Sequence, residues 1–335
     1  MSDVRPGPVE GPGPDGGQIA RAADLLRAGE LVAMPTETVY GLGADAANPA
    51  AVAKIFAAKG RPADHPIIVH IPSADHLERW AREIPEAARQ LAAAFWPGPL
   101  TLILKRQPTV PDAVTGGQDT VGLRVPNHPL ALELLHAFDG GIAAPSANRF
   151  GRISPTRAEH VREELGDKVV LVLDGGPCGV GIESTIVDLS GAVPRILRPG
   201  AITAADIERV LRRDVGGAVN APAPRVSGSL EAHYAPTTPL RLLPAAELHA
   251  AAATALAAGQ RCAVLAFRPP EPAAGLVCLA ASGDAAEYAR DLYAALRRLD
   301  HAGVDLILVA MPPDTEYWQA AIDRLRRAAC GSGVE

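Results

Sequence analysis

The chain has 335 residues, which is long enough for two ordinary domains with a hydrophobic core each. Hydrophobic residues make up 48% and charged residues 21%, as in globular proteins, and the formal net charge of −6 argues against a protein whose main task is to coat nucleic acid. Because the four cysteines, Cys178, Cys262, Cys278 and Cys330, lie far apart without a CxxC pair, a disulfide framework or a structural zinc site is disfavoured and a reducing compartment is expected.

The start of the chain predicts no ordered element. Residues 1–17 are rich in proline and glycine and have neither the basic start nor the apolar core of a signal peptide, so we expect a disordered tail. No apolar run has a length close to that of a transmembrane helix, which needs about 20 residues to cross a bilayer. These features predict a cytoplasmic protein that does not bind membranes.

Hydrophobic periodicity and turn residues predict a mixture of helices and strands over residues 18–213. We expect helices over 18–29, 49–59, 74–81, 86–95, 129–138, 157–165 and 204–213. We expect strands over 31–34, 67–71, 100–105, 120–125, 142–144, 169–173, 184–189 and 195–198. Within the strand over 120–125 lies Arg124, and a charged residue seldom occupies such a place without a partner.

The remainder of the chain predicts a linker and a second, smaller domain. Residues 214–239 are dominated by glycine, proline, alanine and serine, as in a linker. From 240 to 331, strands over 240–243, 262–267, 276–280 and 304–310 alternate with helices over 245–258, 285–299 and 315–329. This alternation predicts a small α/β domain with a mostly parallel sheet, separate from the domain at 18–213.

The segment 34–45, with the sequence MPTETVYGLGAD, is the first that suggests a binding site. We interpret it as a loop at the end of a buried strand. Its proline, glycines and threonines offer a rigid turn, close backbone approach and hydroxyl groups at a place where open α/β sheets bind ligands. The same residue types are common in ordinary polar connections, so this segment alone leaves both interpretations open.

Two further segments suggest a phosphate ligand. Lys59 and Arg61 flank a glycine at the end of a predicted helix, where two cations repel each other unless an anion lies between them. Cations at such a position also occur because they interact favourably with the helix dipole. The segment 145–156 follows a strand and contains Ser146, Asn148 and two arginines, which suit phosphate and ribose but are also typical of a turn.

The familiar nucleotide and metal motifs do not occur in this sequence. There is no Walker A sequence, GxGxxG, HExxH or GxSxG, and nothing marks Ser146 or a cysteine as an activated nucleophile. No protein-bound structural metal is expected, although Mg2+ can arrive with the phosphates that it bridges. The residues themselves therefore predict a crevice for a phosphate-bearing ligand and a second small ligand.

A series of short motifs resembles a known family. They are PTETVYGLG at 35–43, KGRP at 59–62, WPGP at 96–99, LRVP at 123–126, PSAN at 145–148, ESTIVD at 183–188 and LRPG at 197–200. In this order, over about residues 18–213, they closely resemble the YrdC-like L-threonylcarbamoyladenylate synthases. HYAP at 233–236 and the unit after it resemble the long form of the family. The resemblance implies an α/β fold: a YrdC-like twisted mixed sheet followed by a smaller Rossmann-like α/β domain.

The resemblance implies a nucleotidyltransferase that joins L-threonine, bicarbonate or CO2, and ATP into threonylcarbamoyl-AMP and releases pyrophosphate. The product feeds the threonylcarbamoyladenosine modification of tRNA through a downstream transferase complex. Direct tRNA contact by the linker is disfavoured, because residues 229–232 before HYAP are not basic.

The resemblance also assigns roles by motif position. For L-threonine it implies Thr38, His70, Arg124 and Ser184. For ATP it implies Arg61, His65, Thr120, Ser146, Ser154, Arg198 and, from the linker, Tyr234. The KxR and SxN signature of the family, with a catalytic role, corresponds to Lys59, Arg61, Ser146 and Asn148.

Two other interpretations stay open. The basic residues near the crevice, Lys59, Arg61, Arg149 and Arg152, could instead meet an RNA phosphate backbone, although the acidic net charge weighs against an RNA-binding module. A carbamoyl-transfer domain of hydrogenase maturation shares the fold by resemblance. Such a domain normally lies beside zinc-finger and acylphosphatase-like parts, which this sequence does not contain.

Overall fold

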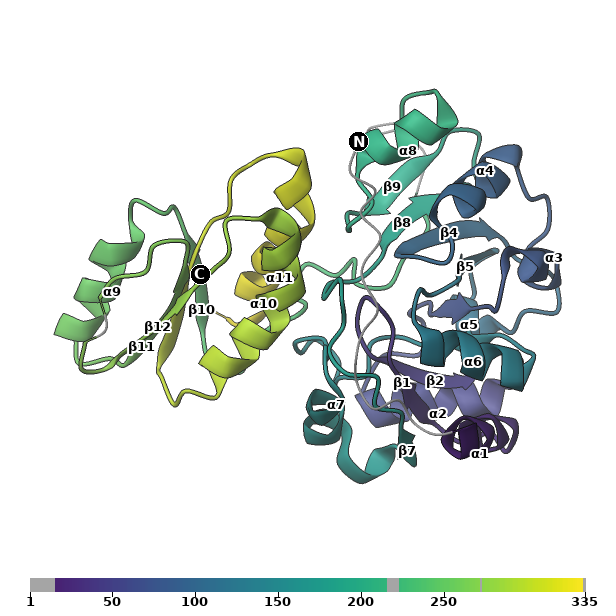
Figure 1. Ribbon diagram of the computed structural model, residues 1–335, viewed down its shortest axis with the longest axis horizontal. Helices are drawn as coiled ribbons and strands as arrows, with labels where there is room; N and C mark the ends of the chain where they lie inside the picture. The colour runs from purple at the N-terminus through teal and green to yellow at the C-terminus, as the bar shows by residue number, and fades with distance from the viewer. Residues whose placement is uncertain (1–15, 216–222, 272, 334–335) are drawn as a thin grey trace. The chain divides into compact units, whose positions relative to one another are not determined.

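The computed structural model describes residues 16–215, 223–271 and 273–333 (Figure 1). These residues divide into two compact units: one runs up to Arg149 and resumes over Pro155–Ser229, and the other combines Phe150–Ser154 with the residues from Leu230 onward. Residues 1–15 of the expected disordered tail lie outside the described residues. Its last two residues, Gly16 and Gly17, instead form the first turn of a helix, so the tail prediction was too long.

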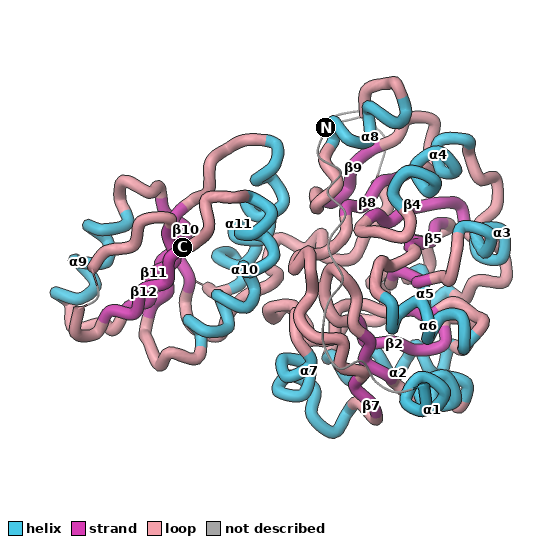
Figure 2. The backbone as a smooth tube through the Cα atoms, viewed as in Figure 1, coloured by secondary structure: helices cyan, strands magenta, loops and turns pink. Residues whose placement is uncertain are grey.

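The first unit is built on a nine-stranded mixed sheet with the order β7-β1-β2-β6-β3-β5-β4-β8-β9 (Figure 2, magenta). Its strands are β1 (Val32–Met34), β2 (Gly41–Asp45), β3 (Ile68–His70), β4 (Leu100–Lys105), β5 (Thr120–Arg124), β6 (Ile142–Ala143), β7 (Leu171–Val172), β8 (Thr185–Asp188) and β9 (Arg195–Arg198). Its helices are α1 (Gly16–Arg27), α2 (Pro49–Lys59), η1 (Ala74–His76), α3 (Leu77–Trp80), α4 (Glu86–Phe95), α5 (Asp112–Thr115), α6 (Pro129–Phe138), α7 (Ala158–Leu165), η2 (Gly166–Lys168) and α8 (Ala204–Leu211). The mixed sheet confirms the expected YrdC-like fold class.

Alternate residues of this sheet face two different cores. In β1, Val32 and Met34 pack with apolar residues of α1 and α6, whereas Ala33 between them belongs to the larger core that contains α2 and α4. This follows from strand geometry, since successive side chains point to opposite faces. The sheet is therefore covered by helices on both sides near β1.

Farther along the sheet, one face is polar. In β5, Val121 and Leu123 lie in the larger core, so Thr120, Gly122 and Arg124 point to the opposite side. The same alternation brings to this side residues from the neighbouring strands: Ile68 and His70, Thr101 and Ile103, and Ser184 and Ile186. We call this side the polar face.

The structure corrects the prediction for the segment 34–45. Residues 41–45, expected to be loop, form β2, which pairs antiparallel with β1. The two glycines of this strand made the sequence look like a loop. Glycine is nevertheless required at position 43, because a Cβ there would lie 2.9 Å from Ile142 Cγ2. The helix expected over 74–81 is divided into η1 and α3, and the short α5 was not predicted.

The second unit contains a four-stranded sheet with the order β10-β13-β11-β12, in which all neighbours are parallel. Its elements are β10 (Leu240–Leu243), α9 (Leu248–Ala257), β11 (Cys262–Ala266), β12 (Leu276–Ala280), α10 (Ala285–Asp300), β13 (Leu306–Ala310), η3 (Glu316–Trp318) and α11 (Gln319–Gly331). Helix α9 packs on one face of this sheet, and α10 and α11 lie on the other (Figure 1). The parallel sheet confirms the expected Rossmann-like α/β unit.

Candidate functional site

The loop between β1 and β2, residues 35–40, is buried and held by hydroxyl groups. Thr36 Oγ1 accepts hydrogen bonds from the backbone N–H groups of Thr38 and Val39, each at 3.2 Å, and donates to the Val39 carbonyl at 2.6 Å. At the end of the loop, the Tyr40 hydroxyl donates to the Gly176 carbonyl at 2.7 Å. These bonds fix the loop before any ligand is present.

Arg124, at the end of β5, is 4% exposed and reaches this loop. Its Nη1 donates to Thr38 Oγ1 at 2.8 Å, and its Nε donates to the Gly98 carbonyl at 3.2 Å. Its Nη2 lies 2.7 Å from Oε2 of Glu37, whose side chain is 6% exposed. This is an ion pair by distance but not a hydrogen bond, because no residue of the described chain hydrogen-bonds to Nη2 or to either Glu37 oxygen.

His70 is the register partner of Arg124 in the parallel pair of β3 and β5. Burial and the neighbouring guanidinium lower the pKa of His70 to about 3, so its imidazole is neutral at pH 7. Its Nδ1 is buried and has no hydrogen-bond partner within residues 16–215, 223–271 and 273–333. We call Glu37, Thr38, His70 and Arg124 the Arg124 pocket.

Lys59 lies at the end of α2, where Gly60 adopts a left-handed φ of 64° and caps the helix. The Lys59 side chain is 4% exposed, and its Nζ donates to the carbonyls of Ser146 and Asn148 at 2.5 Å each. Burial and the charge of Arg61 hold the pKa of Lys59 well below its usual value. The KxR and SxN segments are thus joined by a lysine that fixes the backbone of the second.

Arg198 and Arg61 converge from distant parts of the first unit. Arg198 Nη2 donates to the carbonyl and hydroxyl oxygens of Ser184 at 2.9 and 3.1 Å, and its Nη1 donates to the Ser227 carbonyl at 2.8 Å. Arg61 Nη2 donates to the Pro66 carbonyl at 2.8 Å and reaches Ser227 Oγ at 3.4 Å. We call Arg61, Ser184, Arg198 and Ser227 the Arg198 cluster.

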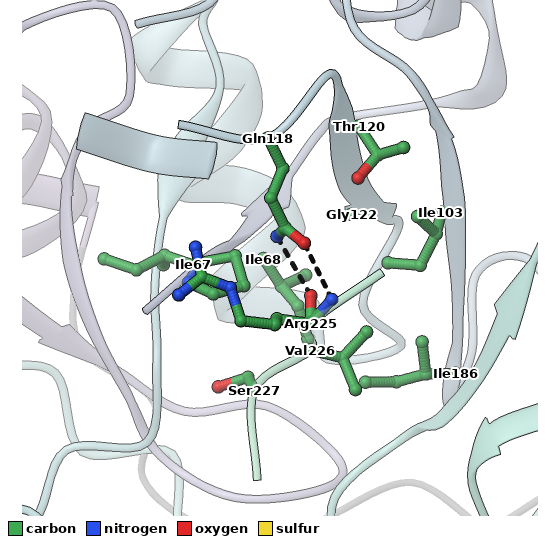
Figure 3. A pocket seen from close by; sticks show the side chains of 11 residues that line it. Ile67, Ile68, Ile103, Gln118, Thr120, Gly122, Ile186, Arg225, Val226 and Ser227 are labelled. Atoms are coloured by element: carbon green, nitrogen blue, oxygen red, sulfur yellow. Dashed lines mark hydrogen bonds between the residues drawn. The ribbon is translucent and has the colours of Figure 1, made fainter. Parts of the chain in front are cut away.

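The linker residues 225–227 run along the polar face beside this cluster. Gln118 exchanges two hydrogen bonds with the backbone of Arg225, at 2.7 and 3.1 Å (Figure 3). Val226 packs against isoleucines of the sheet, and Thr120 lines the same groove. The groove holds about 270 Å³ of empty space that is open to solvent.

Two of the expected ATP residues belong to the second unit. Ser154 lies in Phe150–Ser154, which the sequence places in the first domain. Its neighbour Gly151 accepts a hydrogen bond from the Ala235 N–H at 2.8 Å, which ties this segment to the HYAP motif. Tyr234 adopts a φ of 62°, unusual for a residue with a side chain, and its ring lies 5.3 Å from the Arg324 guanidinium carbon.

His65 follows α2 at the first unit's surface. Its Nε2 lies 4.0 Å from Asp64 Oδ1, and its side chain is partly exposed. Burial, followed by the charge of Arg61, lowers the pKa of His65.

The described part of the chain offers neither a metal cage nor an activated thiol. Within it, no group of three or more His, Cys, Asp or Glu side chains is placed to hold a metal ion. Burial raises the pKa of the Cys178 thiol, which is the opposite of what a nucleophile needs. The helices of the described residues include none with the length and apolar character needed to span a bilayer.

The site residues that sequence reasoning missed are Glu37, Gln118 and Ser227. Glu37 lies within the PTETVYGLG motif, but the sequence assigns it no role, because its burial beside Arg124 depends on the folded structure. Gln118 and Ser227 have no motif of their own and acquire importance only through contacts with partners more than 100 positions away.

The fold and the site together define a class: a two-unit α/β protein whose polar sheet face combines a buried arginine–carboxylate pair with further buried cations. The family follows from comparison with known proteins. The Sua5, YciO and YrdC family profile, described as telomere recombination, matches residues 24–200, and a profile described as the threonylcarbamoyl-AMP synthase C-terminal domain matches residues 202–330. The chain belongs to this family, as its motifs suggest.

Full-length relatives carry the same arrangement. The chain is 43% identical over 326 residues to a threonylcarbamoyl-AMP synthase of Bacillus subtilis, covering 94% of this chain and 93% of the relative. It is 41% identical to that of Pyrococcus abyssi, with 93% and 94% covered. A crystal structure of P. abyssi Sua5 complexed with L-threonine is similar with a TM-score of 0.86 and 40% identity, covering 94% of this chain and 95% of that one.

Proposed function

We propose that this chain is a threonylcarbamoyl-AMP synthase that forms its product from L-threonine, bicarbonate or CO2, and ATP. The observation that carries the proposal is that one polar face of one sheet holds both the Arg124 pocket and the Arg198 cluster. Ser184 lies in this face, with its hydroxyl 2.8 Å from that of Thr101 and 3.1 Å from Arg198 Nη2. An amino acid and a nucleotide can therefore be bound by adjacent parts of the first unit.

L-Threonine occupies the Arg124 pocket in this proposal. A buried guanidinium matches a carboxylate in charge and in its forked geometry. The hydroxyl groups of Thr38 and Ser184 and the neutral imidazole of His70 supply short polar contacts for the rest of the amino acid. His70 donates or accepts here as a neutral group, because its pKa of about 3 keeps it uncharged at pH 7.

ATP binds along the groove beside the Arg198 cluster. Its proposed contacts in the first unit are Arg61, His65, Thr120, Ser146 and Arg198, while Ser154 and Tyr234 of the second unit stay predictions from the resemblance. Phosphate oxygens compete with Ser227 for the donors of Arg61 and Arg198. Mg2+ enters with the phosphates, since the described residues provide no carboxylate cage for it and Mg2+ commonly bridges phosphate oxygens.

The chemistry needs positioning and charge neutralisation. The threonine amine attacks CO2 to form a carbamate, and a carbamate oxygen then attacks the α-phosphorus of ATP as pyrophosphate leaves. Neither step requires a covalent enzyme intermediate, which agrees with the unreactive environment of Cys178. Arg61 and Arg198 offset the charge on the phosphates, and Lys59 holds the carbonyls of Ser146 and Asn148 in place.

The product is a reactive mixed anhydride, and in this proposal a transferase that modifies tRNA consumes it close to where it is made, in the cytoplasm. Direct tRNA binding is not part of the proposal. Of the basic residues that could meet RNA, Arg149 is paired with Glu164 at 3.2 Å and Arg152 donates to the Pro236 carbonyl at 3.1 Å. Each of the two arginines thus has a side-chain donor that is already engaged by a protein partner.

The test is an assay of pyrophosphate release by the full chain, with threonylcarbamoyl-AMP identified by mass spectrometry. Release is expected only when ATP, L-threonine and bicarbonate are all present. Omission of each in turn provides the controls. Pyrophosphate release that does not depend on threonine would contradict the proposal. Tight binding of RNA without any turnover would also contradict it and would favour the RNA-binding interpretation.

A further inference from the structure

We propose that the carboxylate of Glu37 binds the α-ammonium group of the amino acid whose carboxylate is held by Arg124. This inference rests on the proposed function and adds a residue to which no role has been assigned. It makes Glu37 a substrate-binding residue that selects for α-amino acids.

The Glu37 carboxylate is buried without hydrogen bonds in the described part of the chain. It is 6% exposed, and neither of its oxygens receives a hydrogen bond from the described residues. A buried charge without hydrogen bonds is costly, and buried polar groups in proteins are nearly always paired. An acceptor of this kind inside a binding pocket points to a donor supplied by the ligand.

A second buried carboxylate in the same unit shows what a purely structural pair looks like. Asp188 is fully buried and lies 2.7 Å from Arg195 Nη2, as close as Glu37 lies to Arg124. Asp188, however, accepts hydrogen bonds from Arg195 and from the N–H and hydroxyl of Ser190. Glu37 has the same type of partner at the same distance but none of the hydrogen bonds.

The orientation of Arg124 is set by residues other than Glu37. Its Nε and Nη1 are directed at Gly98 and Thr38, so these two residues, rather than Glu37, determine how the guanidinium lies. Its Nη2 has no hydrogen-bond partner within the described ranges. The pocket therefore offers an unused donor and an unused acceptor side by side.

This pair is complementary to a zwitterion. An α-amino acid carries its carboxylate and its ammonium on the same carbon, so a cation and an anion in contact can receive both at once. The charges also balance, since Arg124 and Glu37 cancel and the neutral His70 adds nothing. A carboxylate ligand without an ammonium would leave the Glu37 charge without its partner, which provides the selectivity.

The experiment is a calorimetric titration of the full chain with L-threonine and with 3-hydroxybutanoate, which keeps the carboxylate and the hydroxyl but has hydrogen in place of the ammonium. The unsubstituted protein should bind L-threonine about 10- to 100-fold more tightly, the value of a hydrogen bond to a charged group. In Glu37→Gln, L-threonine affinity should fall by about the same factor, whereas 3-hydroxybutanoate affinity should change by less than about threefold.

Asp188→Asn is the matched control, because it alters the other buried arginine–carboxylate pair without touching the pocket. It should leave both affinities unchanged. Equal losses for the two ligands in Glu37→Gln would show that Glu37 acts only through Arg124 and would overturn the inference. So would a Glu37→Gln variant that binds threonine normally.

The comparison of the two ligands in the unsubstituted protein keeps the inference testable if the variant does not fold. Similar affinities for L-threonine and 3-hydroxybutanoate would by themselves exclude an ammonium site. Failure of the unsubstituted protein to bind L-threonine at all would instead contradict the proposed function. The two failures are therefore distinguishable.

Discussion

The Arg124 pocket and the Arg198 cluster both contain buried arginines, but they differ in what the arginines contact. In the Arg198 cluster, guanidinium groups donate to protein carbonyls and hydroxyls, including those of Ser227 in the linker. In the Arg124 pocket, Nη2 of Arg124 donates no hydrogen bond to the described chain, and neither Glu37 oxygen accepts one from it. The pocket is ready for a ligand, whereas the cluster must exchange protein contacts for ligand contacts.

The difference has an energetic consequence. A hydrogen bond exchanged for another of similar strength changes the free energy by only about 1 kcal/mol or less, whereas a buried charge left without its partner costs about 3–5 kcal/mol. Substitutions in the Arg124 pocket should therefore have large effects, and substitutions in the linker contacts should have small ones.

The largest expected effect is that of Arg124→Ala. The change removes the carboxylate partner and leaves Glu37 buried without a counter-charge, a loss of about 3–5 kcal/mol. We expect kcat/KM for L-threonine to fall by about 100-fold or more, while the KM for ATP changes by less than about threefold. Steady-state kinetics with each substrate varied in turn measures both values.

Arg195→Ala controls for the general cost of breaking a buried ion pair. It removes the partner of Asp188, and Arg195 lies on the edge strand β9, which pairs with neither β3 nor β5, so the change should lower stability without altering the KM for L-threonine. Equal increases of the two KM values in Arg124→Ala would count against the carboxylate assignment. The Arg124 pocket would then not be specific for L-threonine, and the proposed division between it and the Arg198 cluster would be wrong.

The second prediction concerns acid stability. In the folded protein the pKa of His70 is about 3, below the 6.5 of an unperturbed histidine, so the unfolded chain binds the extra proton first as the pH falls. Stability is therefore lost between pH 6.5 and 3, at about 1.4 kcal/mol per pH unit. His70→Gln should remove this loss, so that the variant loses up to about 3 kcal/mol less stability between pH 7 and 4.

Urea unfolding of both proteins at several pH values measures this difference. His136→Gln is the control for the substitution itself, because His136 lies on the exposed side of α6 and outside the Arg124 pocket. Parallel pH profiles for His70→Gln and the unsubstituted protein would mean that His70 is not kept neutral by the pocket.

The third prediction separates two roles of Lys59. Its Nζ donates to the carbonyls of Ser146 and Asn148, so Lys59→Met removes two buried hydrogen bonds at about 1 kcal/mol each. We expect adenylate formation to be slower by about 10- to 30-fold, chiefly because the loop that carries Ser146 loses its anchor. Single-turnover measurements of threonylcarbamoyl-AMP formation test this expectation.

Lys54→Met is the matched control on the same helix, since Lys54 is exposed and pairs with Glu30 at the surface. It should have no measurable effect on turnover. If Lys59→Met also has none, Lys59 neither anchors the loop nor serves the phosphates, and the cations of the first unit act through the Arg198 cluster alone.

Much of the fold could be predicted where local signals determine it. The bounds of α2 follow from the Asn48 cap, the proline after it and the glycine that ends the helix, and the structure has them unchanged. Arg124 was recognised as a charged residue inside a strand that needs a partner. The partner itself, Glu37, could not be predicted, because the contact depends on how β5 and the β1–β2 loop meet in space.

The polar face was hidden for a different reason. Strands β4 and β8 are buried on both faces, so alternation of polar and apolar residues does not reveal which side binds ligands. Only the pairing of β5, β4 and β8 places Thr101, Thr120, Arg124 and Ser184 on one side. The strand β2 was missed because its glycines read as a loop until the pairing with β1 is known.

The smallest expected effect is that of Gln118→Ala, which loosens the linker contact with the cluster. Gln118 holds the backbone of Arg225 by two hydrogen bonds, and residues 225–227 engage both arginines of the cluster. If the linker only competes with phosphate, the KM for ATP should fall by about two- to threefold and the KM for L-threonine should not change. Gln107→Ala removes a similar pair of side-chain bonds to backbone carbonyls, at Glu78 and Ala81, and serves as the control. A rise in the KM for ATP would contradict this expectation, because it would mean that the linker holds the nucleotide rather than competes with it.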